Sequence, residues 1–170
     1  MIAPAKDSMV RLQDGSGPRH FDFHPSGKWA YLVQELSGTV TAFQYSAGKL
    51  KPIQTITTLP AHYDQPFTSA DIHVSLDGKF LYATNRDSSN TVAIFKINQQ
   101  TGQLEPQGHH TTSGKTPRNF NFDPGGDFLL VANQNSDNIV IFRINHKTGG
   151  LSDTGNRIDV GNPVCIKWVR

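Results

Sequence analysis

The sequence predicts an all-β protein built as an arc of a β-propeller, with about three four-stranded antiparallel blades and incomplete blades at both ends. One stretch occurs three times, and its turn glycines Gly27, Gly78 and Gly126 lie 51 and 48 residues apart. A period of about fifty residues, with short apolar runs between glycine-containing turns, is typical of propeller blades. No segment keeps a 3.6-residue apolar period, so almost no helix is expected.

The first repeat contains four predicted strands. In its first run, Phe21 and Phe23 alternate with His20 and Asp22, which puts apolar and polar side chains on opposite faces of a strand. Gly27 then supplies the backbone conformation of a tight hairpin turn. The three further runs of this repeat cover residues 29–33, 39–45 and 50–56. Four antiparallel strands make one blade.

The other two repeats follow the same order of runs and turns. Their clearest apolar runs cover residues 80–84, 91–97, 128–132 and 138–144. We therefore expect one partial propeller over residues 1–170, divided into five parts. These are an outer strand of a preceding blade at 1–16, blades at 17–58, 59–110 and 111–160, and the inner strand of an incomplete blade at 161–170.

Both ends of the sequence resemble parts of a blade. Residues 7–12 look like an outer strand without its inner three, and residues 162–170 repeat the first strand of a unit. Three blades do not close a ring, so we expect a fragment of a larger ring. Exposed strand edges and blade faces favour association, which predicts self-association or pairing with a missing N-terminal half.

Composition and charge exclude several classes of protein. The 16 Lys and Arg residues form no dense cluster and the net charge is only +2, which argues against nucleic-acid binding. No apolar run approaches the ~18 residues of a membrane helix, and no signal peptide is visible. The single cysteine, Cys165, suits a reducing compartment. We therefore expect a cytoplasmic protein in which Cys165 is buried in a strand.

No metal or organic cofactor is expected. The seven histidines are scattered, without the acidic or cysteine companions that a zinc site requires. The sequence also has no glycine-rich phosphate loop followed by a helix, and no serine nucleophile elbow. Any chemistry must therefore come from polar side chains at fixed positions in the blades.

Charged residues occupy equivalent positions in successive blades. Glu35 and Arg86 each lie eight residues after the turn glycine of their blade, and Gln134 has this position in the third blade. Arg19 opens the first strand of the first blade. Since equivalent positions lie around one ring, we expect Arg19, Glu35 and Arg86 to converge near one mouth of the central channel.

Two guanidiniums and one carboxylate suit an anionic substrate. Arginine binds phosphate or carboxylate groups through two parallel hydrogen bonds, and a carboxylate beside it can act as a base or orient water. The spacing equally allows ion pairs that only hold neighbouring blades together. Convergence of the three side chains would favour the functional interpretation.

Several motifs resemble a known family, the lactonases with seven-bladed propellers. The similar segments are residues 17–21, 24–28, 34–36, 39–40, 70–75 and 83–86. Bacterial 6-phosphogluconolactonases belong to this family, and fungal carboxymuconate-cyclising enzymes are related to it. The resemblance spans essentially all 170 residues. It implies a seven-bladed ring of roughly twice this length, of which the chain would be the C-terminal half.

The resemblance also implies an activity and a site. The activity is hydrolysis of 6-phosphogluconolactone, a small anionic sugar lactone of the pentose phosphate route, without metal or organic cofactor. Arg19 and Arg86 match the arginines of the family's cleft, and Glu35 matches its acidic residue. Arg118 and His20 are further candidates for substrate binding. The family adds a histidine from an earlier blade, which lies outside this chain.

Two alternatives to lactone hydrolysis stay open. The first is a non-catalytic propeller that serves as a binding or scaffold module, since this fold alone does not imply an enzyme. The second is a cycloisomerase that acts on a muconate-like dicarboxylate. Asp71 and His73 match a further motif of the family, but we expect them to be hydrogen-bond partners between strands rather than catalytic groups.

Overall fold

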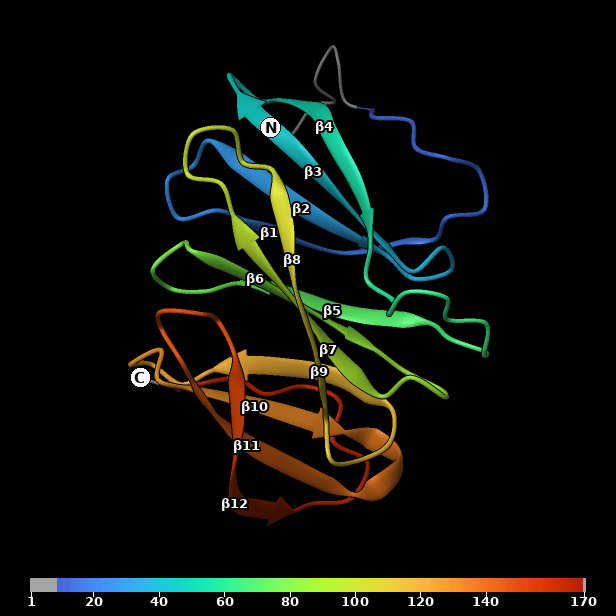
Figure 1. Ribbon diagram of the computed structural model, residues 1–170, viewed down its shortest axis with the longest axis vertical. Coiled ribbons are helices and arrows are strands. Elements are labelled where there is room, and N and C mark those ends of the chain that lie inside the picture. Colours follow the sequence, from blue (N-terminus) through green and yellow to red (C-terminus); the bar gives the residue numbers. More distant parts are fainter. Residues whose placement is uncertain (1–8, 170) are drawn as a thin grey trace, which may run out of the picture.

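The computed structural model describes residues 9–169, which form three four-stranded antiparallel sheets in chain order (Figure 1). The first sheet consists of β1 (Pro18–Phe23), β2 (Trp29–Gln34), β3 (Thr39–Ser46) and β4 (Lys49–Thr57). The second consists of β5 (Ser69–Val74), β6 (Phe80–Asn85), β7 (Thr91–Ile97) and β8 (Leu104–Thr111). The third consists of β9 (Pro117–Phe122), β10 (Phe128–Asn133), the 3-10 helix η1 (Gln134–Ser136), β11 (Asn138–Ile144) and β12 (Leu151–Asp159). The predicted all-β fold is confirmed.

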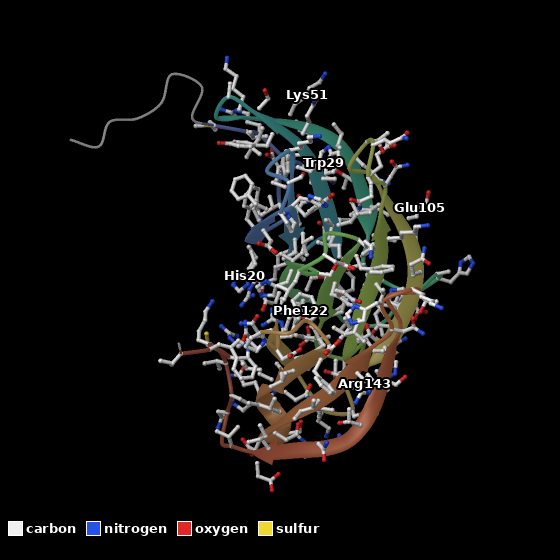
Figure 2. All side chains as sticks on the ribbon, turned by 90° about the vertical axis from the view of Figure 1, so that its left-hand side faces the viewer. His20, Trp29, Lys51, Glu105, Phe122 and Arg143 are labelled. Carbon is white, nitrogen blue, oxygen red and sulfur yellow. The ribbon has the colours of Figure 1, made fainter. Side chains whose placement is uncertain are left out.

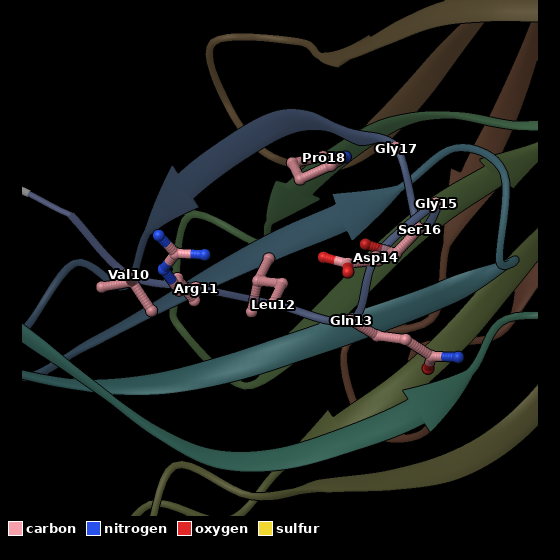
Figure 3. Close-up of a pocket in the computed structure, with 9 residues that line it drawn as sticks. All are labelled: Val10, Arg11, Leu12, Gln13, Asp14, Gly15, Ser16, Gly17 and Pro18. Carbon is pink, nitrogen blue, oxygen red and sulfur yellow. The ribbon is translucent and has the colours of Figure 1, made fainter.

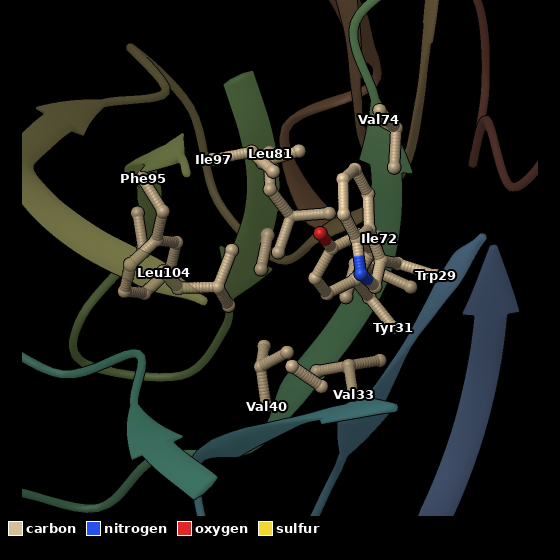
Figure 4. Packing of buried hydrophobic residues seen from close by; sticks show 13 residues of the cluster. Trp29, Tyr31, Val33, Val40, Ile72, Val74, Leu81, Phe95, Ile97 and Leu104 are labelled. Carbon is tan, nitrogen blue, oxygen red and sulfur yellow. The ribbon is translucent and has the colours of Figure 1, made fainter. Parts of the chain in front are cut away.

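The sheets pack face to face, and two apolar layers hold them together. One layer joins the first and second sheets, and the other joins the second and third. Figure 4 shows the first layer, in which Trp29 and Tyr31 lie beside Ile72 of the second sheet. Tyr31 and Phe95 are fully buried there, and each large apolar side chain stabilises the fold by roughly 1.5–3 kcal/mol. The middle sheet is therefore buried on both faces.

The repeated glycines form the hairpin turns that the sequence predicted. Gly27, Gly78 and Gly126 have φ values of 68°, 73° and 79°, a left-handed conformation that glycine adopts without steric cost. In each turn the glycine amide donates a hydrogen bond to the carbonyl oxygen three residues before it, at 2.8–2.9 Å. These turns connect the innermost strand of each blade to the second strand.

In the first two blades, a tyrosine on the second strand bonds to the following blade. The hydroxyl of Tyr31 donates to the carbonyl oxygen of Gly102 at 2.9 Å, and that of Tyr82 donates to the carbonyl oxygen of Gly149 at 2.8 Å. Both glycines lie in the turn between the two outer strands of the following blade. The third blade has Leu130 at the equivalent position, so it offers no hydroxyl for this contact.

The N-terminal segment differs from the prediction. Residues 9–16 form no strand, and residues 1–8 lie outside the described part of the chain. The outer strand expected at 1–16 is therefore absent from the described residues. In the first sheet, Phe21 and Phe23 of β1 are 38% and 47% exposed. Their ring centroids lie 5.0 Å apart, and they give the first sheet an open apolar face.

The C-terminal segment also differs from the prediction. Residues 161–169 come after β12 in the sequence and lie alongside β9, the innermost strand of the third sheet, but they form no strand. Arg170 lies outside the described residues. Here the backbone forms hydrogen bonds with side-chain amides, and not with the backbone of a partner strand. Asn119 Oδ1 accepts from the amide of Ile166 at 2.7 Å, and Asn121 Nδ2 donates to the carbonyl oxygen of Ile166 at 3.0 Å.

Cys165 is exposed, which corrects the expectation that it is buried in a strand. The segment around it reaches the third sheet mainly through Ile166, which is 9% exposed and packs with Leu130 and Ala132. Because this segment runs along the edge of the sheet without being paired on both sides, the neighbouring Cys165 side chain faces outward.

We expect Gly102→Ala to destabilise the chain more than Gly48→Ala does. Both glycines have a left-handed φ, 72° and 78°, so alanine carries a similar strain of about 1 kcal/mol at either position. A Cβ at position 102 would also lie 2.3 Å from Cδ1 of Trp29, whereas a Cβ at position 48 meets open space. Chemical denaturation should show a loss larger by roughly 1–3 kcal/mol for Gly102→Ala. Equal losses would contradict the close packing between these blades.

Candidate active site

Three side chains that the sequence marked as candidates are in contact. Glu35 follows β2 and Arg86 follows β6, and their side chains form an ion pair between neighbouring blades. Nε of Arg19 on β1 lies 3.5 Å from Oε2 of the same Glu35 carboxylate. One carboxylate therefore holds two guanidiniums, one at each oxygen.

The same backbone hydrogen bond places these residues in each blade. The amide of Glu35 donates to the carbonyl oxygen of Gly17, and the amide of Arg86 donates to that of Thr68, both at 2.7 Å. Gln134 makes the corresponding hydrogen bond in the third blade at 2.9 Å. The three positions are structurally equivalent, so the position after the second strand presents its side chain at the same level in every blade.

Burial and charge distinguish this cluster from an ordinary surface ion pair. Arg86 is only 8% exposed. Burial lowers the pKa of the Arg19 guanidinium, and Glu35 opposes this effect. The positive charges of Arg86 and Arg118 lower that pKa further. Arg118 on β9 has no ion pair with a described residue, so it adds a third cation in the neighbourhood of Arg19.

His20 adjoins this cluster on β1. Its Nδ1 lies 2.5 Å from Oδ1 of Asp71 on β5, and its Nε2 lies 3.3 Å from NH1 of Arg19. The His20 side chain is 44% exposed, whereas that of Asp71 is 2% exposed. Figure 2 shows His20 on the side of the molecule opposite Glu105, which lies on the outer strand β8. The cluster thus lies along the inner strands.

Asp71 is a buried carboxylate that joins three inner strands. Besides the contact with His20, its Oδ2 accepts hydrogen bonds from Nδ2 of Asn119 at 2.5 Å and from the amide of Phe120 at 3.1 Å. Burial raises the pKa of Asp71, but the hydrogen bonds from His20 and His73 outweigh this effect and hold the pKa well below its usual range. The carboxylate therefore stays charged although little water reaches it.

Sequence reasoning missed the contact between His20 and Asp71. His20, Asp71 and Asn119 each stand seven residues before the turn glycine of their blade, and the structure places these equivalent positions side by side. We call these three residues the inner-strand row. The equal spacing was a signal that could have found it, but it required pairing positions across blades rather than within one strand.

His73 lies between two carboxylates. Its Nε2 is 3.3 Å from Oδ2 of Asp71, and its Nδ1 is 3.7 Å from Oδ2 of Asp22. Burial lowers the pKa of His73, but the hydrogen bonds and negative charges of Asp22 and Asp71 outweigh burial and raise the pKa to about 9. These contacts agree with the expected role of Asp71 and His73 as hydrogen-bond partners between strands.

Two hollows of the surface do not contain the charged cluster. One, of about 280 Å³, is lined by residues 10–18 alone (Figure 3). Another, of about 410 Å³, is lined by residues around Trp168. We place the candidate site at the cluster because the first hollow comes from a single segment. Its charged residues, Arg11 and Asp14, make no ion pair with each other.

The described residues offer polar side chains but no metal site. No group of three or more His, Cys, Asp or Glu side chains within residues 9–169 could hold a metal ion. In the same part of the chain, no helix is long and apolar enough to span a membrane. The cluster itself offers arginine, glutamate and histidine side chains.

Successive four-stranded blades with cationic side chains along their inner strands define a protein of the β-propeller class. The sequence matches the family model described as lactonase, 7-bladed beta-propeller, over residues 4–168. The chain belongs to this lactonase family, which confirms the resemblance seen in its motifs.

Curated relatives and solved structures agree with this assignment. A 6-phosphogluconolactonase of Formosa agariphila is 49% identical over 130 residues, which are 76% of this chain and 36% of the relative. A 6-phosphogluconolactonase of Bacillus subtilis is 38% identical over 157 residues, which are 91% of this chain and 45% of the relative. The structure of a periplasmic gluconolactonase of Pseudomonas aeruginosa superposes with a TM-score of 0.93 at 37% identity, covering 98% of this chain and 46% of that one. The chain thus spans less than half the length of these proteins.

We expect the free energy of unfolding to fall as the pH rises from about 6.5 to above 9. The folded state raises the pKa of His73 to about 9, compared with an ordinary value of about 6.5. The stabilisation is therefore complete below pH ~6.5 and is lost as the pH passes through ~9. Its size should be on the order of 1–3 kcal/mol.

Denaturation at a series of pH values tests this expectation. His73→Gln should remove most of the alkaline loss of stability. His146→Gln, which removes an exposed histidine at 2.9 Å from Asp127, should leave the loss unchanged. An unaltered pH dependence in the His73 variant would show that another group titrates.

Proposed function

We propose that these blades form part of a sugar lactonase that hydrolyses 6-phosphoglucono-1,5-lactone to 6-phosphogluconate. The observation that carries this proposal is the pairing of Arg19 and Arg86 with one Glu35 carboxylate, with Arg118 as a further cation near Arg19, in a chain of the lactonase family. Relatives named 6-phosphogluconolactonase support the substrate class. The reaction belongs to the pentose phosphate route and would use no metal or organic cofactor.

The substrate and the transition state of this reaction both carry negative charge. Hydrolysis of a lactone passes through a tetrahedral intermediate whose former carbonyl oxygen is an oxyanion. Arg19 and Arg86 would donate hydrogen bonds to this oxygen, and Arg118, with no acidic partner among the described residues, would bind the phosphate. Guanidiniums suit both tasks because they donate several hydrogen bonds in a fixed plane.

Glu35 would organise the two guanidiniums and orient the attacking water. Each of its oxygens contacts a different arginine, so the carboxylate sets the distance between them before substrate arrives. Donors that are already in position need no reorganisation during the reaction, which is the main source of oxyanion stabilisation in enzymes. His20 would form a wall of the same site.

The cytoplasmic location expected from the sequence remains part of the proposal, and one structural neighbour is named periplasmic.

Two competing functions make different demands on the cluster. A scaffold module would need the ion pairs only for stability. A cycloisomerase would use the same cations to bind a dicarboxylate. Direct comparison of turnover for 6-phosphogluconolactone and for a muconate-type dicarboxylate separates these possibilities, and we expect faster turnover of the lactone.

We expect Arg19→Ala and Glu35→Gln each to lower the rate of lactone hydrolysis in the intact protein by at least roughly a hundredfold. Arg19→Ala removes a donor to the oxyanion, and Glu35→Gln removes the charge that holds two guanidiniums together. The rate is measured by trapping the released acid, with correction for spontaneous ring opening.

A remote ion pair provides the matched control. Arg157 and Asp153 pair at 2.6 Å on the outer strand β12. Arg157→Ala and Asp153→Asn remove the same kinds of group, and both should keep the full hydrolysis rate. Near-normal rates for Arg19→Ala and Glu35→Gln would remove the cluster from the mechanism.

A further inference from the structure

We propose that His20 is the proton acceptor for the attacking water and that the buried Asp71 orients it for this role. The inference rests on the lactone hydrolysis proposed above and assigns one step of it. Its basis is the inner-strand row, in which a half-exposed imidazole lies between a buried carboxylate and a guanidinium of the cluster.

The two neighbours of His20 define which ring nitrogen carries the proton. An arginine side chain has donors and no acceptor, so the contact of 3.3 Å from NH1 of Arg19 requires a lone pair on Nε2 of His20. A carboxylate only accepts, so the contact of 2.5 Å with Oδ1 of Asp71 requires a hydrogen on Nδ1. Nε2 is thus the free basic atom of the ring.

Hydrogen bonds from several other groups fix the position of the Asp71 carboxylate relative to the His20 ring. Its two oxygens also accept from Nδ2 of Asn119 and from the backbone amides of Phe120 and Ile72. The carboxylate therefore fixes the orientation of the imidazole and stabilises the imidazolium that forms when Nε2 takes a proton. A buried carboxylate performs these two tasks in serine hydrolases that contain a histidine base.

Glu35 is less suited to accept the proton. One of its oxygens is bound by Arg86 and the other lies 3.5 Å from Nε of Arg19. Protonation of this carboxylate would break an ion pair with a guanidinium that is itself largely buried. The Nε2 lone pair of His20 has only the contact of 3.3 Å with NH1 of Arg19. Bound substrate would replace this contact.

Exposure and position allow Nε2 to reach the substrate. The His20 side chain is 44% exposed. NH1 of Arg19 is close to Nε2, so a lactone carbonyl bound by this guanidinium has the histidine as its neighbour. A water molecule between the carbonyl carbon and Nε2 would then be placed for attack, because a general base must lie within hydrogen-bond distance of the proton that it removes.

The step balances without a further reactant. The water oxygen bonds to the carbonyl carbon while one water proton passes to Nε2 of His20. The bond between that carbon and the ring oxygen then breaks, and the proton on Nε2 goes to the ring oxygen, which leaves as a hydroxyl. The carboxylic acid formed releases its proton to solvent, and His20 returns to its starting form with Asp71 unchanged.

Replacement of His20 tests the assignment in the intact protein. His20→Gln should lower kcat by roughly a hundredfold or more, since a positioned base contributes about that much. His20→Gly should be equally slow, and added imidazole should restore a measurable part of its rate. His146→Gln removes a histidine from an exposed pair with Asp127, and this variant should keep the full rate and show no response to imidazole.

Asp71→Asn tests the positioning role. It should lower kcat with little change in KM in the protein that has His20, and should lower the rate no further in the His20→Gly background. A purely structural role of Asp71 would instead lower both rates alike. Melting of each variant establishes that it is folded, and His20→Gln and His20→Gly, changed at a half-exposed position, carry the test if Asp71→Asn unfolds.

The outcomes separate this inference from the proposed function. If the unmodified protein hydrolyses 6-phosphogluconolactone but His20→Gln and His20→Gly keep more than about a third of its kcat, the base is another group and the lactonase function stands. Slow His20→Gly without imidazole rescue would also overturn the assignment. If the unmodified protein does not hydrolyse the lactone, both proposals fail.

Discussion

The buried carboxylate of Asp71 sets how the inner strands of the three blades align. It binds His20 on β1 and Asn119 on β9, and Asn119 in turn binds the backbone of Ile166. A charge removed from water is tolerated only when several donors satisfy it, so these contacts constrain the distance between blades. The apolar layers press the sheets together without directional preference. The hydrogen bonds of the inner-strand row are directional, so they fix how the blades align.

The candidate active site follows from this alignment. Arg19 and Arg118 directly precede His20 and Asn119 in their strands, so the row brings both guanidiniums to one level. The Glu35 carboxylate, fixed at the end of the second strand, then reaches across to Arg86 of the next blade. Structural and functional interpretations of these ion pairs are therefore not exclusive. The contacts that hold the blades in register also assemble an excess of positive charge.

Much of the fold could be predicted because each turn signal is local. Gly27 and its two equivalents mark hairpins that depend on one backbone angle, and the contact of Glu35 with Arg86 follows from equal positions in adjacent blades. The end segments form no strand within residues 9–169, because strand formation needs a partner, and their assignment to incomplete blades stays a prediction. The backbone of Ile166 meets side-chain amides instead. Cys165 is exposed for the same reason: hydrophobic character in a sequence does not say whether a neighbouring sheet is present.

A crystal structure of the intact protein with 6-phosphogluconate bound tests the central claim most directly. The claim is that the aligned inner strands form an anion site with a base beside it. We expect the carboxylate of the ligand to contact Arg19 and Arg86 and to lie within hydrogen-bond distance of Nε2 of His20, with the phosphate near Arg118. A ligand bound elsewhere, with Arg19 and Arg86 keeping their present protein partners, would contradict the claim.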